Sequence, residues 1–315
     1  MQIIFFCPPV GTINGGIRRI FRMVETLSAA GYDAVVFEEK ARMPEWFESS
    51  ARVVGQGIFQ PNPDQVYVLP EDQPNILPLF KGWPQRKIIH SQNHFYNAMG
   101  LGGADSFTAC GIKDILCCSR TIYDHARVRF PDMKAYLVPC CVDGAVFNPR
   151  AKQKRILFMP RKRLVESIYL RDMFRFSYPE CRDWEWQAVS GKTEAEVARM
   201  MGEAAVFLSL SRLEGLGLTP LETMAAGCVV AGFTGIGGRE YATPENGFWA
   251  DEDDFPACIA QLKKAVDLAQ KPPEDPARKA YQAACAKTLE AFTVAGFEAA
   301  MLAFWKEYLG QEPGS

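Results

Sequence analysis

Residues 1–37 read MQIIFFCPPVGTINGGIRRIFRMVETLSAAGYDAVVF. The apolar run at residues 3–6 predicts a buried strand, and the apolar residues of segment 17–27 recur with helical spacing. A second apolar run, at residues 34–37, follows directly. Strand, helix and strand with short connections predict a right-handed βαβ unit, and therefore a parallel sheet covered by helices.

The same pattern continues along the chain and then starts again. A turn-rich stretch at residues 142–149 (VDGAVFNP) predicts a linker, and a second strand–helix series begins at residues 155–159 (RILFM). A chain of 315 residues suits two domains, each with its own core. We expect two α/β lobes with parallel sheets, residues 1–148 and 149–294. The last predicted helix, within residues 295–312, carries too much apolar bulk to lie free in solvent.

Composition excludes several classes of protein. The 35 Lys and Arg residues balance 37 Asp and Glu residues, which argues against a general nucleic-acid binder. No basic leader precedes the first apolar run, and no apolar stretch approaches the roughly 18 residues that span a bilayer. The ten cysteines show no metal-ligand spacing and are expected to be reduced, buried thiols. These features predict a cytoplasmic protein.

The most informative segment is residues 209–227, SLSRLEGLGLTPLETMAAG. It follows a predicted strand and opens a helix, which is where α/β proteins bind ligands. Gly215 and Gly217 allow a tight turn and a close approach of ligand to backbone. The N–H groups of residues 216–219 would then point outward beside a helix N-terminus, an arrangement that favours a phosphate.

Two carboxylates, Glu214 and Glu222, flank this predicted phosphate cradle. A carboxylate repels phosphate but accepts hydrogen bonds from paired hydroxyls, so the pattern indicates a ligand with hydroxyls on both sides of a diphosphate. A nucleotide sugar is such a ligand. For Glu222 there is an alternative, because Thr219 and Glu222 have the spacing of a capping box. A cap would explain neither Glu214 nor the two glycines.

The stretch EGLGLTPLETMAAG resembles the Glu-x7-Glu motif of family-4-type retaining glycosyltransferases, the glycosyl transferases group 1 with the GT-B fold. Three further segments resemble other parts of that family in the same order: Asn14-Gly15-Gly16, residues 137–149 (LVPCCVDGAVFNP) and residues 233–241 (FTGIGGREY). The resemblance implies two Rossmann-like domains facing across a cleft, with the last helix crossing back to the N-terminal domain. It places the donor on the C-terminal domain and the acceptor on the N-terminal one.

The resemblance also implies roles for particular residues. Glu214 would hold hydroxyls of the transferred sugar, and Glu222 the nucleotide ribose. The remaining donor-binding positions would be Asn14, Gly15, Gly16, Gly215, Leu216, Gly217 and Leu218.

Basic residues after the strand at 155–159 extend this assignment. Arg161 matches the family's arginine that neutralises the diphosphate, but Glu166 and Ser167 stand near the place of its later lysine. Lys162 or Arg163 could substitute, or both could belong to a solvated basic strip. His90 matches a position that contacts the sugar or the acceptor, with an ordinary strand-end residue as the alternative.

The implied reaction is retaining glycosyl transfer without metal or other cofactor, in polysaccharide biosynthesis. A nucleotide-sugar donor would give its sugar to a glycan, lipid-linked or small-molecule acceptor, and the departing phosphate oxygen would take the acceptor's proton. Two alternatives stay open. The chain could be a nucleotide-sugar epimerase or hydrolase of the same fold, or a non-catalytic glycosyltransferase-like binding protein.

Three other stretches carry weaker signals. Residues 191–193 (GKT) imitate the end of a P-loop, but Trp186 stands where its first glycine belongs. Residues 235–238 (GIGG) lack the third spaced glycine of a dinucleotide site. Residues 80–87 (FKGWPQRK) mix aromatic and basic side chains, which fits either a solvated loop or a peripheral contact with the inner face of a membrane.

Overall fold

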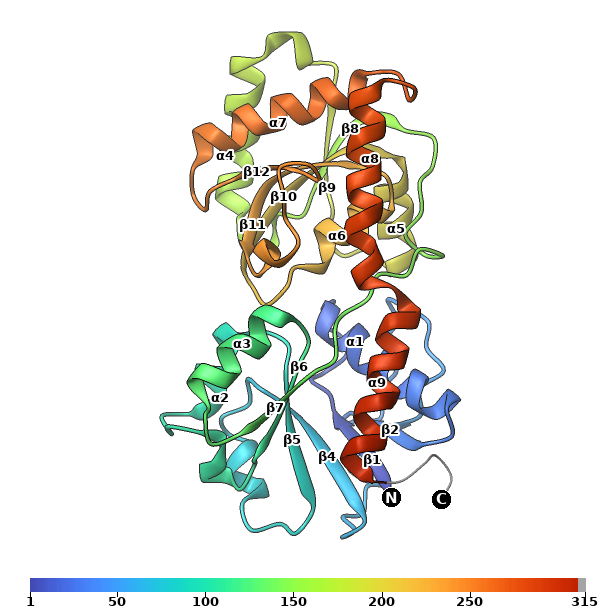
Figure 1. Ribbon diagram of the computed structural model, residues 1–315, viewed down its shortest axis with the longest axis vertical. Helices are drawn as coiled ribbons and strands as arrows, with labels where there is room; N and C mark the ends of the chain where they lie inside the picture. Colours follow the sequence, from blue (N-terminus) through green and yellow to red (C-terminus); the bar gives the residue numbers. More distant parts are fainter. Residues whose placement is uncertain (311–315) are drawn as a thin grey trace. The chain divides into compact units, whose positions relative to one another are not determined.

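The computed structural model describes residues 1–310, which form two compact units. Unit 1 is Met1–Cys140 together with the chain from Ala295 onward, and unit 2 is Cys141–Val294. The turn-rich residues 142–149 lie within unit 2. Each unit is built around one parallel β-sheet covered by helices (Figure 1). The predicted fold class of two Rossmann-like domains is confirmed.

Unit 1 contains a seven-stranded sheet with the order β3-β2-β1-β4-β5-β6-β7, and every neighbouring pair is parallel. Its strands are β1 (Gln2–Phe6), β2 (Asp33–Phe37), β3 (Val53–Val54), β4 (Gln65–Pro70), β5 (Arg86–Ser91), β6 (Asp114–Cys117) and β7 (Lys134–Leu137). Its helices are α1 (Gly15–Ala29), α2 (His94–Leu101), α3 (Arg120–Arg129) and α9 (Val294–Leu309). The central strands β1, β4 and β5 are buried on both faces, as expected for a sheet covered by helices on each side.

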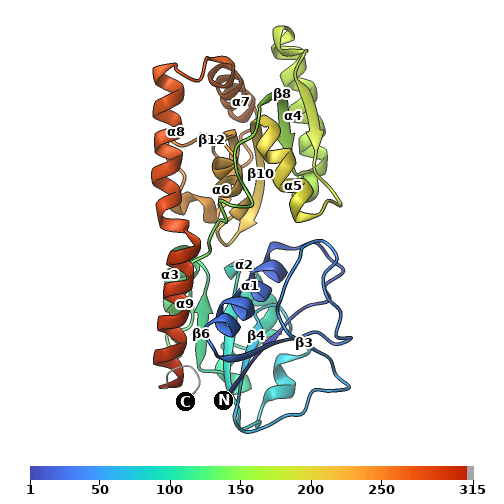
Figure 2. The same ribbon diagram turned by 90° about the vertical axis from the view of Figure 1, so that its right-hand side faces the viewer.

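The last helix, α9, belongs to the core of unit 1, and Figures 1 and 2 show it (red) running alongside the strands of that unit. Trp305 is fully buried and meets the Phe5 ring of β1 edge-on, with 6.0 Å between ring centroids. The Arg86 guanidinium stacks over the Tyr308 ring at 3.9 Å, and the Tyr308 hydroxyl donates to Asp114 at 3.1 Å. These contacts explain the apolar bulk of this segment.

Unit 2 contains a five-stranded parallel sheet with the order β12-β11-β10-β8-β9. Its strands are β8 (Gln153–Phe158), β9 (Glu185–Ala188), β10 (Ala204–Glu214), β11 (Val229–Ile236) and β12 (Phe248–Ala250). Its helices are α4 (Leu164–Ser177), α5 (Glu194–Glu203), α6 (Leu218–Ala225), α7 (Phe255–Gln270) and α8 (Pro276–Leu289). Helices α4 and α7 pack together on one face of the sheet, and α5 and α6 cover the other (Figure 1).

The strand order places a topological switch point in each sheet. In unit 2, β8 and β10 are neighbours, but the chain leaves β8 toward β9 on one side and leaves β10 toward β11 on the other. In unit 1, the same divergence occurs between β1 and β4. Loops beyond the carboxyl ends of such strands separate and leave room for a ligand. In unit 2 these are residues 159–163 and 215–217.

Close packing between β10 and β11 gives a test of the sheet beneath this site. Gly232 has φ +120°, and a Cβ there would collide with the backbone oxygen of Ser209 and lie 3.0 Å from its nitrogen. We expect Gly232→Ala to lower the free energy of unfolding by about 3 kcal/mol. Strands β10 and β11 are each paired with a further strand on their other side, so they cannot move apart to admit the new methyl group.

Denaturant unfolding measures this effect. Gly144→Ala is the matched control, because a Cβ at Gly144 in the same unit meets nothing within 4 Å. Equal stabilities for the two variants would contradict the packing argument.

Candidate functional site

The loop that follows β10 begins with an irregularity in the strand itself. The pairing with β11 shifts register between Ser211 and Glu214, and Leu213 has φ +50°. Helix α6 then starts at Leu218 with Gly217, at φ +82°, as its N-cap. Thr219 therefore lies inside the first turn and does not cap the helix. The capping-box alternative for Glu222 is wrong, because no side chain caps α6, and the first-turn N–H groups have no partner within the helix.

Glycines at the end of β11 make room for this turn. A Cβ at Gly235 would lie 2.9 Å from Cγ of Glu214, and one at Gly237 would lie 2.6 Å from the backbone carbon of Gly215. Both distances are shorter than real Cβ contacts allow, so the loop containing Glu214 packs directly on these two residues. The GIGG sequence thus serves packing of the loop.

Tyr241 fixes the loop from the other side, and sequence reasoning assigned it no role. Its buried hydroxyl donates a hydrogen bond of 2.7 Å to the Gly217 carbonyl. Burial, and then the negative charges of Glu214, Glu222 and Glu240, raise the pKa of Tyr241 well above its usual value. The hydroxyl therefore stays protonated, and both glutamates of the motif lie near enough to bias it.

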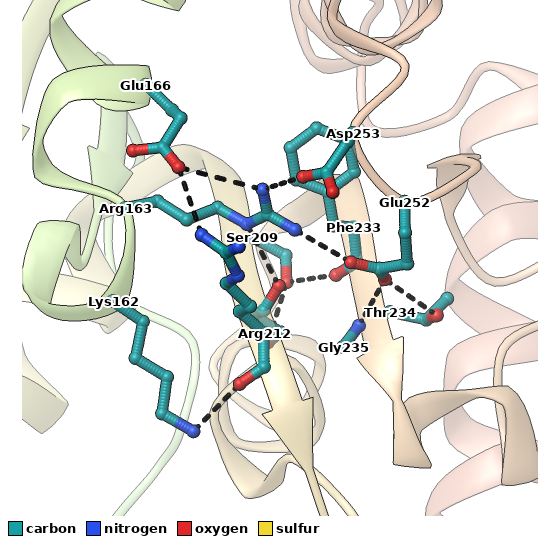
Figure 3. Close-up of polar contacts among 11 residues, drawn as sticks. Lys162, Arg163, Glu166, Ser209, Arg212, Phe233, Thr234, Gly235, Glu252 and Asp253 are labelled. Atoms are coloured by element: carbon teal, nitrogen blue, oxygen red, sulfur yellow. Dashed lines mark hydrogen bonds and ion pairs between the residues drawn. The ribbon is translucent and has the colours of Figure 1, made fainter.

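Lys162 connects the loop after β8 to the loop after β10. It ends a short 3-10 turn, Pro160–Lys162, that directly follows β8. Its Nζ lies 2.8 Å from Oε1 of Glu214. It also donates to the Arg212 carbonyl at 2.9 Å, as Figure 3 shows. A cation is thus held beside the first glutamate of the motif.

Arg163 is directed into unit 2, and only 1% of its side chain is exposed. Its guanidinium forms ion pairs with Asp253 and, at 2.8 Å, with Glu252, and it stacks over the Phe233 ring at 4.4 Å (Figure 3). Glu252 also accepts from the Gly235 N–H at 2.8 Å. Arg163 therefore ties the end of β11 to the loop after β8, and Lys162 is the residue whose charge lies beside Glu214.

Arg161 lies at the start of the same turn in a different setting. Its side chain is exposed, and within residues 1–310 it has no hydrogen bond or ion pair. One basic tripeptide thus supplies an outward cation, a cation paired with Glu214, and a buried structural cation.

Comparisons with known proteins relate the chain to glycosyltransferases. The model of the family "Glycosyl transferases group 1" matches residues 185–283, which include the loop after β10. A curated protein of Actinobacillus pleuropneumoniae, an "Alpha-1,6-glucosyltransferase", is 26% identical over 276 residues, covering 84% of this chain and 83% of that protein. These matches support a group 1 glycosyltransferase.

Solved structures show that this glycosyltransferase has the GT-B fold. Sucrose-phosphate synthase of Thermosynechococcus elongatus has a TM-score of 0.68 and 14% identity, with coverage of 98% of this chain and 100% of that one. A trehalose-6-phosphate protein of E. coli, bound with UDP-2-fluoro glucose, has a TM-score of 0.66 and 10% identity, and 98% of each chain is covered.

In unit 1 of the glycosyltransferase, the predicted glycine loop starts helix α1. The Asn14 side chain caps the helix by accepting from the Gly16 N–H at 2.8 Å. A Cβ at Gly16 would lie 3.0 Å from Oε1 of Gln92, whereas one at Gly15 would meet nothing within 4 Å. The loop therefore packs on Gln92 through Gly16 and stays open at Gly15.

His90, at the carboxyl end of β5, is buried rather than open to a ligand in this structure, with 2% of its surface exposed. It accepts a hydrogen bond of 3.2 Å from Nε of Arg19. Burial, and then the positive charge of Arg19, lower the pKa of His90 well below its usual value, so the ring is neutral. Arg19 also donates to the Val138 carbonyl at 2.6 Å, and the helical pattern gave no sign of this buried cluster.

The P-loop imitation proves to be a helix start. Thr193 caps α5 in a capping box with Glu196, and Lys192 pairs with Glu196 at 3.0 Å.

Among residues 1–310, no group of three or more His, Cys, Asp or Glu side chains is placed to hold a metal ion.

Glu71 supports the loops at the switch point of unit 1. Its carboxylate is buried directly after β4 and accepts hydrogen bonds from the N–H groups of Gln92 (2.9 Å) and Asn93 (2.8 Å). Burial raises the pKa of Glu71 from its ordinary 4.5 to about 8, with a smaller contribution from Asp72. At neutral pH this carboxyl group is therefore largely protonated.

Glu71 predicts a pH dependence of stability. Between about pH 4.5 and 8 the folded chain keeps a proton that the unfolded chain releases, so stability falls as pH rises through this window. We expect Glu71→Gln, which is neutral throughout, to remove a decline on the order of 5 kcal/mol. Denaturant unfolding of both proteins at several pH values measures the difference. Parallel pH profiles would show that the Glu71 carboxyl titrates normally.

Proposed function

We propose that this glycosyltransferase is a retaining, metal-independent enzyme that moves a sugar from a nucleotide-diphosphate donor to a glycan, lipid-linked or small-molecule acceptor. Unit 2 binds the donor and unit 1 the acceptor. The observation that carries the proposal is the Lys162–Glu214 ion pair at the switch point of unit 2, beside the glycine turn that starts α6. A cation for the diphosphate and a carboxylate for the sugar lie in contact there.

Glucose is the first donor sugar to test, carried on UDP. The Actinobacillus pleuropneumoniae relative is named for glucosyl transfer, and the E. coli structure holds UDP-2-fluoro glucose. Both likenesses support a donor of this class for the present chain. Comparison of UDP with GDP, dTDP, CMP and ADP in a thermal-shift assay tests the base, since a tight ligand raises the melting temperature by mass action.

The geometry suits the charges that develop during transfer. When the bond between the anomeric carbon and the phosphate oxygen breaks, its electron pair leaves with the diphosphate. Arg161, Lys162 and the N-terminus of α6 stabilise that negative charge as preorganised electrostatics. Lys162 has three N–H donors, of which Arg212 and Glu214 occupy two, so one is left for a phosphate oxygen.

Retention follows from attack on the same face of the sugar. The acceptor hydroxyl bonds to the anomeric carbon as the diphosphate departs, and its proton passes to the departing phosphate oxygen. Glu214 accepts hydrogen bonds from hydroxyls of the transferred sugar, and Glu222 from those of the ribose. Activity that survives a metal chelator, with an axial product from an axial donor, supports this chemistry. Free or isomerised sugar formed equally without acceptor would instead favour the hydrolase or epimerase.

The role of Glu214 predicts a loss of turnover. We expect Glu214→Gln to lower transfer by about tenfold or more, because the neutral amide accepts weaker hydrogen bonds from the sugar hydroxyls and loses its ion pair with Lys162. The measurement is initial rate of UDP-glucose turnover at saturating donor. Glu274→Gln, on the exposed surface of the same unit, is the control. Transfer by Glu214→Gln at the rate of the control would refute the assignment.

The role of Lys162 predicts that its removal weakens binding of the diphosphate group and leaves binding of the nucleoside unchanged. We expect Lys162→Met to weaken UDP binding by about tenfold while uridine binding is unchanged, because a charge-assisted hydrogen bond to phosphate is lost. Calorimetric titration with both ligands measures this. Lys154→Met, on β8 and paired at the surface with Asp183, is the matched control. An equal loss for UDP and uridine would mean that Lys162 acts on the shape of the site.

A further inference from the structure

Helix α4 carries an exposed apolar surface that the transfer reaction does not use. Five large side chains contribute to it, and we call them the α4 face: Leu164, Val165, Ile168, Tyr169 and Phe176. Val165 is 75% exposed and Phe176 78%. At about 100° per residue, Val165, Ile168 and Phe176 lie on the side of the helix opposite Leu170 and Phe174, which pack into unit 2. Leu164 and Tyr169 flank them, and the Tyr169 ring also packs edge-on against Phe255 of α7 at 5.9 Å between centroids. An apolar strip this long on a surface helix indicates an interaction site.

Unpaired arginines border the α4 face. Arg161 precedes the helix, and Arg171 and Arg175 lie along one edge of the face. Within the described residues, none of the three has a carboxylate partner or a hydrogen bond, although the neighbouring basic residues Lys154 and Arg155 are paired with acids. The local charge is therefore positive, opposed on the face itself by Asp172.

The aromatic and basic stretch at residues 80–87 is built differently. Phe80 is buried and packs on Trp83 with 5.3 Å between ring centroids, and Arg86 is stacked on Tyr308 of α9. Lys87 donates to two backbone carbonyls of the same stretch. Most of these side chains serve the core of unit 1.

In the part of the chain that the structure covers, no helix has the length and hydropathy to cross a bilayer.

We propose that the α4 face binds an anionic membrane surface. The apolar side chains enter the boundary between headgroups and acyl chains, and Arg171 and Arg175 contact lipid phosphates. Helices that lie in the plane of a bilayer have this composition, with aromatic and aliphatic residues on one face and arginines at its edge. Positive charge beside the apolar strip complements an anionic leaflet. The proposal does not depend on which donor or acceptor the enzyme uses.

Vesicle sedimentation with the full chain tests the proposal. The protein should pellet with vesicles of equimolar phosphatidylglycerol and phosphatidylcholine, and much less with phosphatidylcholine alone, and added salt should weaken binding. The double variants Ile168→Ser/Phe176→Ser and Arg171→Glu/Arg175→Glu should each bind about tenfold more weakly. Asp172→Asn should bind more tightly, because the opposing charge is removed.

Three controls make the result decisive. Val128→Ser removes an apolar side chain that is 83% exposed on α3, and Trp83→Ser alters the stretch at residues 80–87; both should bind as the wild type does. Thermal unfolding and UDP binding verify that the α4 variants remain folded. Wild-type protein that stays in the supernatant with anionic vesicles would overturn the proposal. So would self-association that the α4 variants abolish in the absence of vesicle binding, since the face would then bind a second copy.

Discussion

The ion pair between Lys162 and Glu214 couples two loops that come from different strands. In a parallel sheet, β8 and β10 end at the same edge, and their chains then diverge to opposite sides. Side chains that follow the two strands can therefore meet only above this edge. The 2.8 Å contact shows that they do, and it brings opposite charges together at the switch point of unit 2.

Three contacts hold that ion pair in place. Gly235 and Gly237 admit the Glu214 loop because neither carries a Cβ, and Tyr241 bonds the Gly217 carbonyl from the far side of the loop. Arg163 joins the neighbouring strand end to Glu252 and Asp253 from within the domain. Close backbone packing and the buried ion pairs of the Arg163 guanidinium thus support the polar residues of the site. These contacts fix the conformation of the loop in the absence of ligand.

Periodicity was sufficient to predict both sheets, because strands buried on both faces appear as short apolar runs between turn residues. It failed for α4, whose apolar residues lie on its buried and its exposed side, so that no single stripe stands out. The glutamate motif was recognisable because its spacing is local. The different roles of Lys162 and Arg163 could not be recognised from the sequence, because Arg163 is held by Glu252 and Asp253, which lie about 90 residues away in the chain. The burial of His90 likewise depends on Arg19, which α1 brings to it.

The net charge of −2 conceals how differently this chain uses its basic residues. Arg161, Lys162 and Arg163 are consecutive, yet one is exposed, one is paired at the site and one is buried among carboxylates. A short turn after β8 separates them, because successive residues in a 3-10 turn point in different directions. Arg163 pairs with Glu252 and Asp253, and Lys162 pairs with Glu214, so the unpaired positive charge on this turn is that of Arg161. The chain as a whole is therefore nearly neutral, although the surface at this turn is positive.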